Sequence, residues 1–88
     1  MYSVRLARRA ERGLRRIRVG DPRGYQRVAA AIRSLADDPQ PPGATKLTAF
    51  APPAWRLRVG DYRIVYEVDD DRVLVIAVNV APRGEVYR

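Results

Sequence analysis

The chain contains no cysteine and no histidine, and these two absences narrow its chemistry. Without cysteine the protein has neither a disulfide framework nor a thiolate nucleophile. Without histidine as well, the usual ligand sets for zinc, copper and non-haem iron are missing, so any metal would have to be bound by carboxylates alone. We therefore expect no bound metal and no other cofactor.

Long apolar runs are also missing from the sequence. The N-terminal segment, residues 1–14, lacks the apolar stretch of a signal peptide, and no segment approaches the length needed to span a bilayer. We expect a cytoplasmic protein with no membrane partner. A chain of 88 residues is long enough for one domain, spanning 1–88, with a single modest hydrophobic core.

Negative charge is scarce in the first part of the chain. The sequence holds 17 basic and 10 acidic residues, a net charge of +7, and Lys46 is its one lysine. Residues 1–36 contain ten arginines and two acidic residues, net +8, whereas residues 37–88 are close to neutral. Such an excess favours a polyanionic partner, either nucleic acid or an acidic protein. A GC-rich genome also produces arginine-rich chains, so arginine positions are more informative than arginine abundance.

The first half of the chain predicts a short strand at residues 2–6 and then two helices. Apolar residues recur at helical spacing in both, and Asp21 with Pro22 supplies an N-cap and a first-turn proline for the second. The expected apolar face of the first helix comprises Leu6, Ala10, Leu14 and Ile17. That of the second comprises Tyr25, Val28, Ala29, Ile32, Leu35 and Ala36.

The first predicted helix also has a basic outer face. Four arginines lie off its apolar stripe: Arg8, Arg12, Arg15 and Arg16. A charged helix face is by default a solvated surface. Because the positive excess of the chain is concentrated here, contact with nucleic acid is an equally weighted interpretation.

The second half of the chain changes to the period of strands. Strands are expected at residues 46–48, 55–59, 62–68 and 72–80, and the last is apolar on both faces, as in a strand inside a sheet. The helical hairpin can cover one face of this sheet. The sequence therefore predicts an α+β fold, with an N-terminal strand and helical hairpin packed on a twisted antiparallel sheet of about four strands. The uncovered face then carries Arg56, Arg58 and Arg63.

Residues 55–63, WRLRVGDYR, predict a hairpin with a two-residue loop, and this loop places Arg58 directly opposite Arg63. Like charges in facing positions of a sheet are destabilising. A bound phosphodiester, which arginine binds in a bidentate and charge-assisted way, would relieve that repulsion. The alternative is that both side chains extend into water, or that Asp61 and Glu67 screen them.

The segment APRGEVYR, residues 81–88, adds Arg83 and Tyr87 at the end of the sheet. RNA cleavage without a metal needs a base for the 2′-OH, a group that stabilises the phosphorane and an acid for the 5′-oxygen. Nearby positive charge favours the phenolate form of a tyrosine, so Tyr87 suits the role of base. Arg63 and Arg83 suit charge stabilisation. Packing of Tyr87 against the sheet edge is an equally weighted alternative.

The order of elements and the sequence together resemble the RelE/ParE toxin superfamily, above all the RelE-like mRNA interferase toxins of type II toxin–antitoxin systems. The most specific segments are KL at 46–47, WRLRVGDYRIVYEV at 55–68 and VNVAPRGEVYR at 78–88. ParE-like members share much of this pattern. The resemblance therefore identifies the fold more firmly than the activity.

The resemblance implies a metal-independent endoribonuclease that associates with the ribosome and cleaves mRNA by 2′-OH attack. Its catalytic residues would be Arg63, Arg83 and Tyr87, and Arg56 and Arg58 would bind the phosphate. RelE-like members often have lysine at the latter two positions. Arginine keeps phosphate binding but weakens a role in proton transfer. The basic helix face described above would contact ribosomal RNA.

The resemblance also implies partners: the ribosome, mRNA and a cognate acidic antitoxin that carries a DNA-binding domain. An alternative from another class is a ParE-like toxin that inhibits DNA gyrase by binding, without cleaving RNA. A third is a non-toxic member that remains only as a binding module. The joint presence of Arg63, Arg83 and Tyr87 favours the nuclease, since a protein that only binds has no need of that set.

Overall fold

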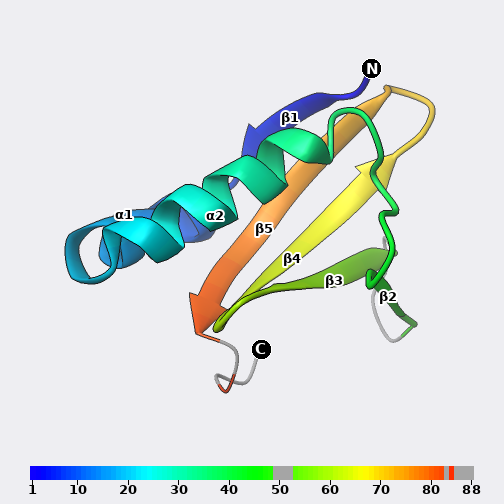
Figure 1. Ribbon diagram of the computed structural model, residues 1–88. Coiled ribbons are helices and arrows are strands. Elements are labelled where there is room, and N and C mark those ends of the chain that lie inside the picture. Colours follow the sequence, from blue (N-terminus) through cyan, green and yellow to red (C-terminus); the bar gives the residue numbers. More distant parts are fainter. Residues whose placement is uncertain (49–52, 83, 85–88) are drawn as a thin grey trace.

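The computed structural model describes residues 1–48, 53–82 and 84. These residues form two helices and five strands, and both helices lie on one face of the sheet (Figure 1). The predicted two-layer α+β architecture is confirmed. In chain order the elements are β1 (Ser3–Leu6), α1 (Arg8–Gly20), α2 (Pro22–Ser34), β2 (Thr45–Leu47), β3 (Ala54–Val59), β4 (Tyr62–Asp69) and β5 (Leu74–Pro82).

The sheet has the strand order β1-β5-β4-β3-β2. Strands β2 to β5 are antiparallel neighbours, which confirms the predicted antiparallel sheet of about four strands. The N-terminal strand β1 adds a fifth strand, parallel to β5, and makes the whole sheet mixed. A parallel pair needs a long crossover connection. Helices α1 and α2 are part of the crossover connection between β1 and β5.

Helices α1 and α2 form where the sequence predicts them, except that α2 ends at Ser34, so Leu35 and Ala36 of its expected apolar face follow the helix. Helix α2 is capped at its first turn. The Asp21 carboxylate accepts a hydrogen bond from the Gly24 backbone N–H at 3.1 Å, and Pro22 is the first helical residue. Leu6 differs from expectation: it ends β1 opposite Ala77 and is 37% exposed, so it does not belong to the apolar face of α1. Pairing with β5 keeps it in strand conformation.

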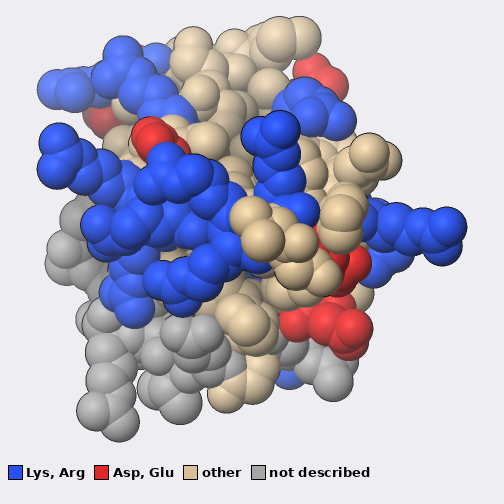
Figure 2. Space-filling model, turned by 90° about the vertical axis from the view of Figure 1, so that its left-hand side faces the viewer, with Lys and Arg blue, Asp and Glu red and all other residues tan. Residues whose placement is uncertain are grey.

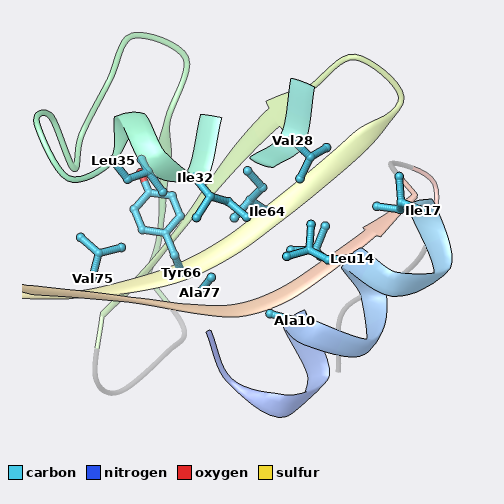
Figure 3. Close-up of a cluster of buried hydrophobic side chains, with 11 residues drawn as sticks. Ala10, Leu14, Ile17, Val28, Ile32, Leu35, Ile64, Tyr66, Val75 and Ala77 are labelled. Carbon is cyan, nitrogen blue, oxygen red and sulfur yellow. The ribbon is translucent and has the colours of Figure 1, made fainter. Parts of the chain in front are cut away.

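The hydrophobic core lies between the helices and the sheet. Figure 3 shows the apolar faces of both helices directed at side chains from β4 and β5. Tyr66 is fully buried at the centre, where its hydroxyl donates to the Pro39 carbonyl at 2.8 Å. Burial raises the pKa of Tyr66 to about 12.

Helix α1 approaches the sheet closely at one glycine. A Cβ atom on Gly13 would overlap the Val80 carbonyl oxygen of β5, a backbone atom. Only glycine therefore permits this separation between α1 and β5. This close approach sets the position of the α1 arginines relative to the end of β5.

The start of β5 also differs from the prediction. The strand begins at Leu74, two residues later than the sequence pattern indicated, because the turn after β4 extends to Val73. The Asp69 carboxylate accepts a hydrogen bond from the Arg72 backbone N–H at 3.1 Å, and Val73 adopts a φ of 53°. In the described part of the chain, neither helix is long or apolar enough to cross a membrane.

Candidate functional site

The face of the sheet away from the helices carries three arginines on β3 and β4, here called the arginine face: Arg56, Arg58 and Arg63. Strand register places Arg58 opposite Arg63 and Arg56 opposite Val65, so the predicted facing pair of guanidinium groups is confirmed. Gly60, the first loop residue, has a φ of +58°, as a type II′ turn requires. The loop chemistry thus fixes the register that brings the arginines together.

Direct ion pairing does not offset the charge of two of these arginines. Among the described residues, neither Arg56 nor Arg58 forms a salt bridge, so neither Asp61 nor Glu67 pairs directly with them. Because facing like charges in a sheet are destabilising, the pairing of Arg58 with Arg63 carries an electrostatic cost. A bound anion would remove that cost.

Two buried residues, one of them polar, lie on the same side of the sheet as the arginine face. Val65 is 2% exposed and Asn79, opposite it on β5, is 7% exposed. The register shifts between Val65 and Tyr66, and Val78 is the extra residue of this β-bulge. Bulges are frequent next to active sites, where they redirect a side chain. The sequence pattern did not single out Asn79, whose one signal is an amide inside the apolar run of β5.

Arg83 and Tyr87, the two other predicted catalytic residues, lie outside the described residues, and their roles stay predictions. Strand β5 ends with Ala81 opposite Arg63 and Pro82 opposite Tyr62. The chain therefore leaves the sheet beside the arginine face.

A pocket of about 440 Å³, here called the α1–β5 pocket, lies between α1 and the C-terminal half of β5. Three arginines of α1 line it: Arg9, Arg12 and Arg16. Their spacing puts them on one side of the helix. Arg12 and Arg16 belong to the predicted basic helix face. Arg9 does not, although the spacing i, i+3, i+7 would have identified it. The other two predicted contacts, Arg8 and Arg15, are exposed on α1 but do not line this pocket.

Basic side chains dominate this end of the molecule. Figure 2 looks onto the turn between α1 and α2 and shows Lys and Arg side chains over much of the face, with few acidic groups among them. The charge asymmetry of the sequence thus becomes a continuous basic surface. Such a surface attracts polyanions and raises their rate of association.

One carboxylate, that of Asp21, also lines the α1–β5 pocket, and both of its oxygens are engaged. Oδ1 accepts from the Gly24 backbone N–H at 3.1 Å, and Oδ2 accepts from the Tyr62 hydroxyl at 2.8 Å. The hydrogen bond from Gly24, with a smaller contribution from that of Tyr62, holds the pKa of Asp21 below its usual value. The same bond to Asp21 raises the pKa of Tyr62. Asp21 therefore stays ionised and ties the helical hairpin to β4.

The arrangement can bind phosphate by charge and by hydrogen bonds. Guanidinium groups bind phosphate oxygens in bidentate fashion, and they occur here on two neighbouring surfaces, the arginine face and the α1–β5 pocket. Within the ranges 1–48, 53–82 and 84, no group of three or more His, Cys, Asp or Glu side chains is placed to hold a metal ion.

Comparison with known families gives one match that spans nearly the whole chain. A family model described as the ParE toxin of the type II toxin–antitoxin system parDE matches residues 4–87. A search of curated protein sequences finds no significant match.

Solved structures with the same fold come from toxin–antitoxin systems. The RelBE2 toxin–antitoxin complex of Mycobacterium tuberculosis matches with 26% identity and a TM-score of 0.78, covering 93% of this chain and 98% of that one. The archaeal RelE–RelB complex of Pyrococcus horikoshii matches with 24% identity and a TM-score of 0.80, covering 97% and 98%. The YoeB dimer of Staphylococcus aureus matches with 16% identity and a TM-score of 0.75, covering 98% of each chain.

Proposed function

Because this chain belongs to the ParE toxin family, within the RelE/ParE superfamily of type II toxin–antitoxin systems, we propose that it is a toxin acting as a ribosome-associated endoribonuclease. The reaction would be metal-independent cleavage of mRNA by attack of a ribose 2′-OH on the adjacent phosphate. The observation that carries this proposal is the facing pair Arg58 and Arg63 beside Arg56, on a sheet face that the helices leave uncovered.

Each arginine of this face has a role in the proposed reaction. Arg56, Arg58 and Arg63 bind the non-bridging oxygens of the scissile phosphate, and Arg63, together with Arg83, stabilises the charge of the phosphorane. Tyr87 as phenolate removes the 2′-OH proton. The attacking oxygen forms the new bond to phosphorus, and the bond to the 5′-oxygen breaks. The products are a cyclic phosphate and a 5′-hydroxyl end, after that oxygen takes up a proton.

The proposed partners follow from the family and from charge. The structural neighbours include toxin–antitoxin complexes, which support an antitoxin partner. We propose that this antitoxin is acidic, that a segment of it folds over the basic surface, and that it also carries a DNA-binding domain. The exposed arginines of α1, including Arg8 and Arg15, are proposed to contact ribosomal RNA, with the cytoplasm as the site of action.

The test is induction of the toxin with two single substitutions, Arg63→Ala and Tyr87→Phe, and primer extension on translated mRNA. We expect discrete cuts within codons from the unmodified protein and loss of cuts and of growth arrest from each variant. Arg72→Ala is the control, because Arg72 lies in the turn after β4 and is highly exposed. Full toxicity of both site variants would contradict the catalytic assignment. Gyrase-linked DNA breaks without mRNA cuts would instead identify the ParE-like alternative.

A further inference from the structure

We propose that the α1–β5 pocket is a second phosphate-binding subsite, which holds a phosphodiester of the RNA substrate next to the one bound on the arginine face. The inference rests on the proposed function, because it assumes an RNA ligand. It assigns Arg12 and Arg16 to this subsite as its phosphate ligands and Asn79 to the boundary between the two sites.

The size and charge of the pocket suit a nucleotide phosphate. Its volume of about 440 Å³ is within the range of pockets that hold small ligands. Arg12 and Arg16 are one helical turn apart and repel each other, which destabilises a helix. Among the described residues, the carboxylate that lines the pocket is that of Asp21, and it already accepts hydrogen bonds at both oxygens, from Gly24 and Tyr62. The surplus of positive charge in the pocket therefore favours an anion.

The pocket and the arginine face share one strand, β5. Ala81 and Asn79 line the pocket, and they also stand opposite Arg63 and Val65, which belong to the uncovered face. Strand β1 pairs with β5 only as far as Ala77, so no described strand extends the sheet beyond the later residues of β5. An extended polyanion that crosses this edge would contact both groups of arginines.

The side chain of Asn79, at the β5 edge shared by the pocket and the arginine face, independently supports a ligand site there. The residue is more than nine-tenths buried, yet its side chain has no hydrogen bond to another residue in the part of the chain that the structure describes. None of its amide atoms is sealed from solvent without a partner. A mostly buried amide that keeps an open approach is suited to bind a ligand, and RNA offers ribose hydroxyls and base edges as its partners.

The experiment compares the binding of two single-stranded RNA oligonucleotides to the complete purified chain. A dinucleotide fits one site, whereas a hexanucleotide reaches both, and 2′-O-methyl groups prevent cleavage. The variant is Arg12→Gln/Arg16→Gln. The matched control is Arg23→Gln/Arg33→Gln, which removes the same charge from exposed positions of α2 that do not line the pocket.

We expect the unmodified protein and the control to bind the hexanucleotide more tightly than the dinucleotide. The pocket variant should lose about tenfold in hexanucleotide affinity, as for a lost charged hydrogen-bond pair, with little change for the dinucleotide. Its salt slope should fall by about 0.7, the value for one phosphate contact on a single strand. Asn79→Asp, nearly unchanged in size, should also weaken the hexanucleotide selectively.

Other outcomes would overturn the subsite. Equal affinities of the pocket variant and the control for the hexanucleotide would do so. A loss seen only with vacant ribosomes would assign the phosphate to ribosomal RNA, and a loss seen only with the antitoxin would assign the pocket to an acidic protein. Failure of the proposed function has a separate signature, namely oligonucleotide binding that follows this pattern with no mRNA cleavage by the unmodified toxin.

Discussion

The two faces of the β3–β4 hairpin differ in what they contribute to the protein. On the covered face, Ile64 and Tyr66 are fully buried against the helices, and burial of apolar surface stabilises the fold. On the arginine face, Arg58 stands opposite Arg63, and facing like charges in a sheet are destabilising. Successive residues of the same strands thus lie in different environments. We infer that stability depends on one face and anion binding on the other, so substitutions on the two faces should have separable effects.

The largest expected effect comes from Gly13→Val, which separates α1 from β5 on the covered side. The new side chain would overlap the Val80 carbonyl oxygen, and neither backbone segment can move without disrupting the core. We expect a loss of about 3 kcal/mol in the free energy of unfolding, as for severe overpacking. Thermal unfolding followed by circular dichroism measures it.

Gly20→Ala is the control for this substitution. Gly20 is also in α1, but a Cβ atom there would meet no other atom within 4 Å. The melting temperature should stay the same or rise slightly, because alanine favours helix more than glycine does. Equal destabilisation by both substitutions would show that the close approach to Val80 is not what limits position 13.

The start of α2, the register of the β3–β4 hairpin and the fold class could be predicted because each depends on residues close together in the sequence. Asp21 before a proline specifies a helix start, and the Gly60-Asp61 loop fixes the register that pairs Arg58 with Arg63. These signals lie within a few residues of their consequences. The α+β class was predictable for the same reason, since the change from helical to strand periodicity is local.

The remaining features depend on contacts between distant segments. The α1–β5 pocket exists because Gly13 lets α1 approach β5, and the sequence alone does not specify that distance. Asn79 joins the arginine face because a bulge shifts the register of β5 against β4, and no nearby turn residue signals the bulge. The late start of β5 likewise depends on how the turn at Val73 folds.

A smaller effect on the covered face is expected from Tyr66→Phe. The substitution keeps the ring in the core but removes the hydroxyl that donates to the Pro39 carbonyl, a loss of about 1 kcal/mol. Folding raises the pKa of Tyr66 from 10.0 to about 12, so the folded state holds this proton more tightly than the unfolded state. Stability from this group is therefore complete below pH 10 and is lost as the pH rises towards 12.

Chemical denaturation at several pH values between 9 and 12 tests this prediction, with the pH values chosen to span the interval in the two pKa values. The variant should show a flatter pH dependence than the unmodified protein over this interval. Tyr2→Phe is the comparison, because Tyr2 donates to Asp70 in an exposed position. A pH profile unchanged by Tyr66→Phe would mean that another group governs alkaline unfolding.

A substitution in the turn between β4 and β5 is expected to stabilise the protein, unlike Gly13→Val and Tyr66→Phe. Val73 has a φ of 53° and is 43% exposed, so its branched side chain is strained and contributes little packing. Asparagine tolerates this conformation better than a branched residue does. Val73→Asn should raise the free energy of unfolding by roughly 0.5 to 1 kcal/mol. A lower midpoint in urea would indicate that Val73 makes stabilising contacts that outweigh its backbone strain.

The smallest expected change in stability is the sharpest test of the comparison between the two faces. Arg58→Gln removes the repulsion with Arg63, so the free energy of unfolding should rise by a few tenths of a kcal/mol, while RNA affinity falls. Arg56→Gln is the matched control, because Arg56 faces Val65 and not another arginine. It should lose affinity without gaining stability. If Arg58→Gln destabilised the protein, the facing arginines would contribute to its stability. The two faces would then not have separable effects on stability and anion binding.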